Sequence, residues 1–289
     1  MKPPPFRYAA PSSVAEAVDL LVRHAAVEPR VLAGGQSLVP LMNFRLAQPG
    51  HLIDLRRVAD LDGIRVHGDY LVIGAMARQS AVEDAPEVAL TAPLLAEAIG
   101  LVADRTVRNS GTIGGSLAHA DPTAELPAVA LALDAELVAT GPGGIRGIPA
   151  AEFFRGPFST ALAADEILTE IRLPRREGGH AFIEFARTHG TFAIVAVAAQ
   201  IELDGGRISR AALALTGVAP TAVRATAAER ALVGATPDTA ATAAAADAAV
   251  SGLTPAGDVQ ASATTRTELA RTYVRRALDL ALSRAQDRR

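Results

Sequence analysis

Two segments with paired glycines constrain this chain more than any other feature of its sequence. The first is VLAGGQSLVPLMNFRL at residues 31–46, and the second is NSGTIGGSLAHADPTAELP at residues 109–127. Glycine allows a positive φ and leaves room for a ligand beside the backbone, so successive amide N–H groups can converge on an anion. A helix that begins just after such a loop adds the positive end of its dipole. The segments therefore predict two anion-binding loops, although each pair taken singly is also typical of a plain tight turn.

The residues around the two glycine pairs narrow the kind of anion. Hydroxyl donors stand at Ser37, Thr112 and Ser116, but no lysine follows either pair. This excludes the GK[ST] ending of a P-loop, and neither segment has the G-x-G-x-x-G of a Rossmann site. A diphosphate held by neutral amides fits the pattern better than a triphosphate with magnesium.

Composition excludes several classes of protein. The chain has 289 residues, 49% of them hydrophobic, and a net charge of −3, which gives it no electrostatic reason to bind nucleic acid. It contains no cysteine, so it can form no disulfide and can ligate no iron–sulfur cluster with thiolates. The longest apolar run, residues 192–199, is far shorter than the ~20 residues of a membrane helix, and the first residues show no secretory signal. We expect a cytoplasmic protein whose partners are small molecules or other proteins.

Hydrophobic periodicity predicts the elements of the first half. Ser13 and Glu16 have the spacing of a capping box, and apolar residues at helical spacing predict a helix over 14–24. A strand at 30–32, a helix at 38–46 and a strand at 51–55 form a βαβ-like unit. Further along we expect a hairpin over 64–73, helices at 93–103 and 123–133, and strands at 136–140, 144–149 and 166–174.

A polar, glycine-bearing stretch at residues 175–180 is the best linker candidate, with a domain boundary near residue 176. Beyond it, alternating patterns predict three antiparallel strands at 181–186, 192–203 and 207–218. The stretch 221–265 is dominated by Ala and Thr, and residues 267–286 carry a helical apolar stripe. We expect a cluster of three helices packed on this meander, within an α+β fold.

The two glycine segments, taken with EILTEIRLP (166–174) and FAIVAVAA (192–199), resemble the FAD-binding medium subunit of the molybdenum hydroxylases, the carbon monoxide dehydrogenase and xanthine dehydrogenase group. The resemblance runs from about Phe6 to the last helix. It implies a PCMH-type FAD-binding domain over 1–176, with subdomains of about 1–57 and 58–176. A C-terminal flavoprotein domain of the carbon monoxide dehydrogenase type, with a three-stranded antiparallel sheet and a helix cluster, would occupy 177–289.

The resemblance also implies the residues that hold a non-covalent FAD. Its diphosphate would lie between two groups of residues. Its hydroxyls would meet Glu125, apolar contacts would come from Val102 and Leu168, and Phe192 would lie over the isoalloxazine. No catalytic side chain and no metal ligand is expected. His119 and Asp121 are two residues apart, as metal ligands sometimes are, but no third ligand stands at a recognisable spacing, so the pair is expected to stabilise a loop. The two groups at the diphosphate are Leu32, Ala33, Gly34, Gly35, Gln36, Ser37 and Leu38, and Thr112, Ile113, Gly114, Gly115 and Ser116.

Three positions depart from the pattern of that family. Many members have Asp where this chain has Glu125, and many read Gly-Asp-Phe where this chain has Gly190, Thr191 and Phe192. Where members commonly carry a cofactor-contacting lysine, this chain has Glu184. That contact is therefore expected to be lost or to come from Arg187.

The resemblance and the missing cysteines together predict an electron-transfer subunit. FAD would receive electrons from [2Fe-2S] clusters on a small partner subunit, after oxidation of a substrate at the molybdenum cofactor of a large partner subunit. The acceptor would be NAD, a quinone or oxygen, and the assembly a dimer of heterotrimers. Two alternatives remain open: a self-contained PCMH-type flavin oxidoreductase, and a non-redox scaffold that has lost flavin.

Overall fold

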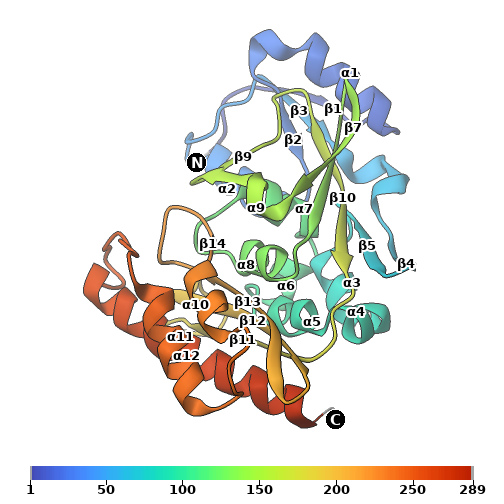
Figure 1. Ribbon diagram of the computed structural model, residues 1–289. Coiled ribbons are helices and arrows are strands. Elements are labelled where there is room, and N and C mark those ends of the chain that lie inside the picture. The colour runs from blue at the N-terminus through green and yellow to red at the C-terminus, as the bar shows by residue number, and fades with distance from the viewer. Residues whose placement is uncertain (1, 288–289) are drawn as a thin grey trace.

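The computed structural model describes residues 2–287, and its elements form an elongated molecule with the N-terminal part at one end and the C-terminal helices at the other (Figure 1). The N-terminal part is a parallel sheet of three short strands in the order β1 (Arg7–Ala9), β3 (His51–Asp54) and β2 (Arg30–Leu32). Helix α1 (Val14–Arg23) packs on this sheet, and the 3-10 turn η1 (Ala25–Val27) follows it. The predicted βαβ-like unit is confirmed, whereas the short strand β1 was not predicted.

Helix α2 (Leu38–Asn43) is shorter than the predicted helix over 38–46. The chain turns out of the helix at Arg45, which has a φ of 61°. The N–H groups of Leu46 and Ala47 then both donate to the carbonyl of Leu41, so the helical ladder ends there. The 3-10 turns η2 (Leu55–Arg57) and η3 (Ala59–Leu61) lead from β3 to the next sheet.

The central sheet is antiparallel, with the strand order β4 (Ile64–His67), β5 (Tyr70–Gly74), β10 (Ile167–Pro174), β6 (Glu136–Gly141) and β7 (Gly144–Pro149). The predicted hairpin over 64–73 is confirmed, with Gly68 at a φ of 58° in its turn. This sheet shares one core with the helices α3 (Gln79–Asp84), α4 (Pro86–Thr91), α5 (Pro93–Ile99), α7 (Ile113–His119) and α8 (Glu125–Ala132). The short helix α6 (Arg105–Arg108) lies between α5 and α7 in the chain.

The second glycine pair is helical, and this corrects the prediction of a loop there. Gly114 and Gly115 lie in the first turn of α7, which begins at Ile113 behind its N-cap, Thr112. Neither glycine has a positive φ. The sequence also gave no sign of the short elements α9 (Ala150–Phe153), β8 (Phe154–Gly156) and β9 (Ser159–Thr160), which follow β7.

The C-terminal part has an antiparallel sheet in the order β11 (Gly179–Phe185), β12 (Val195–Asp204), β13 (Arg207–Thr216) and β14 (Val223–Arg224). Its first three strands confirm the predicted meander. The expected linker is shorter than predicted, because β11 already begins at Gly179, whose backbone lies against α12: a Cβ there would stand 1.8 Å from the carbonyl oxygen of Ala281.

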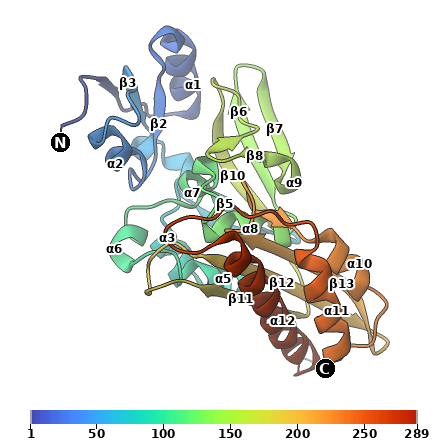
Figure 2. The ribbon, with the colours of Figure 1, turned by 90° about the vertical axis from the view of Figure 1, so that its left-hand side faces the viewer.

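Helices α10 (Thr226–Leu232), α11 (Thr239–Val250) and α12 (Ala263–Asp287) confirm the predicted cluster, which packs on one face of the C-terminal sheet (Figures 1 and 2). The other face contacts α5 and α8, so β12 is buried on both sides. Ala196 and Ala198 belong to the central core, whereas Val195 and Val197 belong to the core of the C-terminal helices. The C-terminal sheet thus joins the two halves of the molecule.

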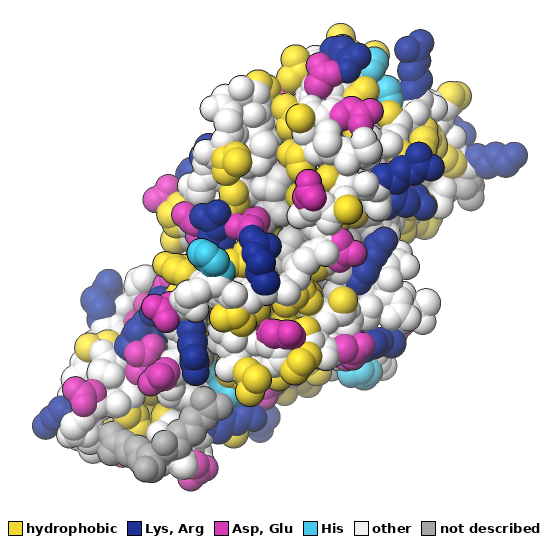
Figure 3. Space-filling view, turned by 90° about the vertical axis from the view of Figure 1, so that its right-hand side faces the viewer, with side chains coloured by type: hydrophobic (Ala, Val, Ile, Leu, Met, Phe, Trp, Pro, Cys, Tyr) yellow, Lys and Arg dark blue, Asp and Glu magenta, His cyan; other side chains and the backbone are white. Residues whose placement is uncertain are grey.

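Charges of both signs are interspersed over the face of the molecule in Figure 3, without a continuous basic surface on that face. Among residues 2–287, none of the helices is long and apolar enough to cross a membrane.

Candidate functional site

The first glycine segment and the start of α7 are in direct contact. A Cβ added to Gly34 would stand 2.3 Å from the carbonyl oxygen of Ser110 and 2.7 Å from the Cα of Gly111. A Cβ on Gly115 would stand 3.2 Å from the Cβ of Ala33. The fold therefore brings together the two segments that the sequence singled out, where the loop before α2 meets the start of α7.

Residues 33–37 form an open cradle between β2 and α2, which we call the first glycine loop. Gly35 adopts a φ of 72°, and the side-chain amide of Gln36 donates to the carbonyl of Gly34 at 3.2 Å. Among residues 2–287, no protein acceptor is found for the backbone N–H groups of residues 34–38. Because β2 and β3 are parallel, the loop lies at the carboxyl edge of their sheet. These free donors can hold an anion.

The amides at the start of α7 are already engaged, contrary to the prediction that they would be free for an anion. The N–H of Ile113 donates to the carbonyl of Ala77 at 3.1 Å, and that of Gly114 to the carbonyl of Ala75 at 2.9 Å. The N–H of Gly115 donates to Oγ1 of Thr112 at 3.0 Å.

Close packing accounts for the second glycine pair. A Cβ on Gly114 would stand 2.5 Å from the Cβ of Ala75, so only glycine lets α7 approach the chain after β5. Gly115 likewise leaves room for Ala33. The two glycines therefore let α7 pack against the chain after β5 and against the first glycine loop.

Two arginines hold the segment that leads into α7. Arg78 donates to the carbonyl of Ser110, and Arg108 donates to the carbonyls of Val102 at 2.8 Å and Ala103 at 3.0 Å. Glu83 accepts from Arg108 at 2.8 Å and 3.0 Å, and these bonds lower the pKa of the Glu83 carboxyl. The sequence carries no local signal for the contact of Arg78 with Ser110 or of Arg108 with Glu83, because these partners lie 32 and 25 residues apart along the chain.

The remaining expected contact residues divide into buried and exposed groups. Val102 and Leu168 are 8% and 5% exposed and share a core cluster with Ile113. Phe192 is 59% exposed in the connection between β11 and β12. Gly190 in the same connection lies against Ala103, since a Cβ there would be 3.3 Å from its carbonyl. Phe192 therefore lies on a segment that contacts Ala103, the residue that follows Val102.

Two carboxyl groups, those of Glu125 and Glu184, interact electrostatically near the start of α8. Glu125, the first residue of α8, is only 5% exposed, and Oε2 of Glu184 is buried without a hydrogen-bond partner among residues 2–287. Burial, followed by the charges of Glu184 and Asp121, raises the pKa of Glu125 to about 8. Burial raises the pKa of Glu184 to about 7. Arg187 does not replace the expected basic contact, because its guanidinium donates to the carbonyls of Val259 and Gln260.

His119 and Asp121 serve the local structure. The His119 ring lies 5.0 Å from the Phe158 ring, and burial lowers the pKa of the imidazole. Asp121 accepts from the backbone N–H and the hydroxyl of Thr123 at 2.8 Å and 2.7 Å. The described residues contain no group of three or more His, Cys, Asp or Glu that could hold a metal ion.

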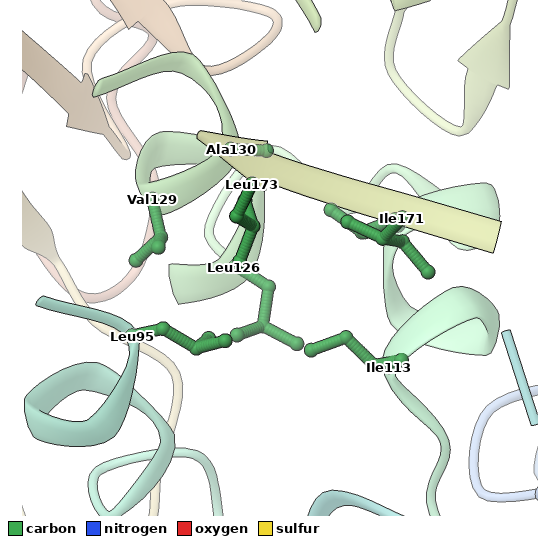
Figure 4. A pocket seen from close by; sticks show the side chains of 8 residues that line it. Leu95, Ile113, Leu126, Val129, Ala130, Ile171 and Leu173 are labelled. Carbon is green, nitrogen blue, oxygen red and sulfur yellow. The ribbon is translucent and has the colours of Figure 1, made fainter. Parts of the chain in front are cut away.

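The cavity shown in Figure 4 is a packing gap. It measures about 10 Å³ and is lined by apolar side chains, among them Leu95, Ile113 and Leu126. So small an apolar space holds no ligand. A larger hollow of about 330 Å³ lies between the turns after β3 and the start of α3, lined by residues 56–59 with Asp62, Met76 and Arg78.

Comparisons with known proteins agree over the whole length. Residues 4–176 match the family described as the FAD binding domain in molybdopterin dehydrogenase, and residues 180–281 match the CO dehydrogenase flavoprotein C-terminal domain. The carbon monoxide dehydrogenase medium chain of Hydrogenophaga pseudoflava is 43% identical, over 98% of this chain and 99% of that protein. The 6-hydroxypseudooxynicotine dehydrogenase complex subunit alpha of Paenarthrobacter nicotinovorans is 42% identical, over 99% and 97%.

A solved structure is equally similar. A chain of carbon monoxide dehydrogenase from Hydrogenophaga pseudoflava, in a form that lacks the Mo-pyranopterin moiety of its cofactor, superposes with a TM-score of 0.96 at 45% identity, over 99% of this chain and 100% of that one.

Proposed function

Because this chain belongs to the FAD-binding medium subunits of the carbon monoxide dehydrogenase-type molybdenum hydroxylases, we propose that it binds FAD between the first glycine loop and α7 and passes electrons from a partner's iron–sulfur clusters to an external acceptor. The chain is an oxidoreductase subunit. The observation that carries the proposed site is the contact of Gly34 and Gly115 with the opposite segment, next to backbone donors that lack acceptors.

The residues present fit an FAD diphosphate. The N–H groups of residues 34–38 are donors without acceptors, and the loop that carries them turns at Gly35, which has a φ of 72°. Ser37 and Ser116 add hydroxyl donors. The diphosphate would thus bind mainly to the first glycine loop, with α7 as the wall behind it.

The rest of the site would orient the cofactor. Glu125 would meet hydroxyls of the ribityl or ribose groups, while Val102 and Leu168 would form apolar contacts and Phe192 would cover a flavin face. FAD supplies the redox chemistry when it is bound. This chain contributes binding, orientation and exclusion of water, which is why no catalytic side chain is assigned.

The electron donor must lie on another chain. All 289 residues lack cysteine, so iron–sulfur clusters ligated by thiolates need a partner. We place them on a small [2Fe-2S] subunit and the molybdenum cofactor on a large subunit, in a dimer of heterotrimers. Relatives whose names carry different substrates are 43% and 42% identical to this chain, so we assign the choice of substrate to the large subunit. We place the boundary between the FAD-binding and C-terminal domains near residue 176.

Replacement of Gly34 tests the site. The Cβ of Gly34→Ala would clash with the backbone at Ser110 and part the loop from α7, so FAD affinity should fall at least about tenfold, or ~1.4 kcal/mol. Gly63→Ala is the matched control, because a Cβ there meets nothing within 4 Å. Flavin absorbance per chain and circular dichroism report cofactor content and folding.

Three results would contradict the proposal in different ways. Full flavin content in Gly34→Ala would argue against the site. A wild-type chain that takes up no FAD would favour the scaffold that has lost flavin. A purified chain that oxidises an organic substrate alone would favour the self-contained oxidoreductase.

A further inference from the structure

We propose that Glu125 and Glu184 form a paired-carboxyl site beside the space where FAD is proposed to bind, which we call the cofactor cleft, and that this pair must hold a proton for the cleft to accept FAD, so that cofactor uptake takes up a proton. The inference rests on the proposed function, since it concerns the same cleft. It gives Glu184 a role in cofactor binding.

The register of β11 directs Glu184 toward Glu125. Along this strand, Ala181 and Ile183 pack into the core of the C-terminal helices, whereas Phe182 belongs to the central core. Side chains alternate between the faces of a strand, so Glu184 lies on the same face as Phe182, toward α5 and α8. Glu125 begins α8, and the charge of Glu184 reaches it.

Among residues 2–287, no basic side chain forms an ion pair with Glu125 or Glu184. After burial, the charges of Glu184 and Asp121, both acidic, raise the pKa of Glu125, and burial raises the pKa of Glu184. Charged side chains on the elements packed around the pair are engaged elsewhere. Glu97 of α5 is held by Arg284 of α12, Arg224 of β14 by Asp134 and Glu229, Arg266 of α12 by two carbonyls and Asp258, and Arg187 by two carbonyls.

A retained proton is the remaining way to relieve these two carboxyl groups, because Glu125 is buried and the half-buried Glu184 has its Oε2 shielded from solvent. Two carboxylates in a poorly solvated site cannot both ionise cheaply, so the pair retains a proton. This agrees with the raised pKa values of about 8 for Glu125 and about 7 for Glu184. His119, the nearby imidazole on α7, has a lowered pKa and adds no compensating positive charge.

FAD binding also favours the protonated form of the carboxyl pair. Its diphosphate brings negative charge into the cleft, and ionised carboxylates in the wall repel it. A protonated carboxyl instead offers an O–H donor to a cofactor oxygen. Binding therefore favours the protonated pair, and above the titration of the pair each bound FAD takes one proton from solvent.

The test measures FAD affinity from about pH 6 to about pH 9, with affinity expected to weaken up to about tenfold per pH unit above the pKa of the pair. Calorimetry in two buffers of different ionisation enthalpy counts the proton taken up. Glu184→Gln should flatten the pH profile and remove most of that proton uptake. The control is Glu152→Gln, an exposed glutamate on α9, which should behave as the wild type.

A second measurement needs no cofactor. Infrared difference spectra of the free protein near neutral pH should contain the C=O stretching band of a protonated carboxyl, and Glu184→Gln should lower the pH at which it disappears. Tight FAD binding that does not vary with pH would overturn this inference and leave the proposed function intact. Failure to bind FAD at any pH would overturn both. If the pH dependence of FAD affinity were unchanged in Glu184→Gln, Glu184 would not be part of this site.

Discussion

Arg266 should be the most costly single charge to remove from the C-terminal half. Its guanidinium, 4% exposed, donates to the carbonyls of Ile194 at 2.6 Å and Gly217 at 2.9 Å, and to Asp258 at 2.7 Å. Arg266→Leu would leave two carbonyls without a donor, at about 1–3 kcal/mol each, and would leave Asp258 without its cation. We therefore expect a loss of about 3–5 kcal/mol in the free energy of unfolding, measured by urea titration followed by circular dichroism.

Arg271, five residues further along α12, is the matched control. It pairs with Asp247 at 2.9 Å, but the two side chains are 49% and 72% exposed. Arg271→Leu should cost no more than about 1 kcal/mol, because exposed ion pairs contribute little. If the two variants differed by less than about 1 kcal/mol, the argument from buried carbonyls would be refuted.

Two further predictions concern the core and pH. Leu95→Ala enlarges the gap in Figure 4 and should lower the free energy of unfolding by about 2–5 kcal/mol, whereas Leu90→Ala, at a side chain that is 79% exposed, should cost less than about 0.5 kcal/mol in the same urea titration. Burial, His24 and Arg7 lower the pKa of His51, so the unfolded chain binds the proton more readily than the folded one. Stability should therefore fall as the pH drops below the unfolded imidazole pKa of about 6.5, and urea midpoints that did not change between about pH 7.5 and about pH 5.5 in the wild type, or that changed equally in His51→Phe, would contradict this cause.

Sequence patterns that lie within a single helix correctly predicted that helix. The predicted cap of α1 is present, because the N–H of Glu16 donates to Oγ of Ser13 at 3.2 Å, while the Glu16 carboxylate accepts from the N–H of Ser12 at 2.8 Å rather than from that of Ser13. The stripe on α12 is present as well, with Ala270, Val274 and Ala277 fully buried. These patterns depend on spacing within one element, and spacing can be seen in a sequence.

Features that depend on distant partners could not be predicted from the sequence. Gly114 and Gly115 were predicted to form a loop, but they are helical, and the close approach of Ala75 and Ala33 explains the need for glycine there. A glycine that admits a ligand and a glycine that admits a neighbouring backbone have the same sequence signature. The first glycine loop differs only because its amides find no acceptor, which is a property of the fold.

The carboxyl pair shows how strand register creates chemistry that no motif announces. Glu125 and Glu184 are far apart in the chain and meet because β11 places Phe182 and Glu184 on one face and Ile183 on the other. A slip of one residue would turn Glu184 into the core of the C-terminal helices, where an unpaired carboxyl costs several kcal/mol. Gly179 opposes such a slip, because its backbone lies against Ala281 and any side chain moved into its place would clash with α12. The glycine that packs β11 onto α12 therefore also holds Glu184 in the cofactor cleft.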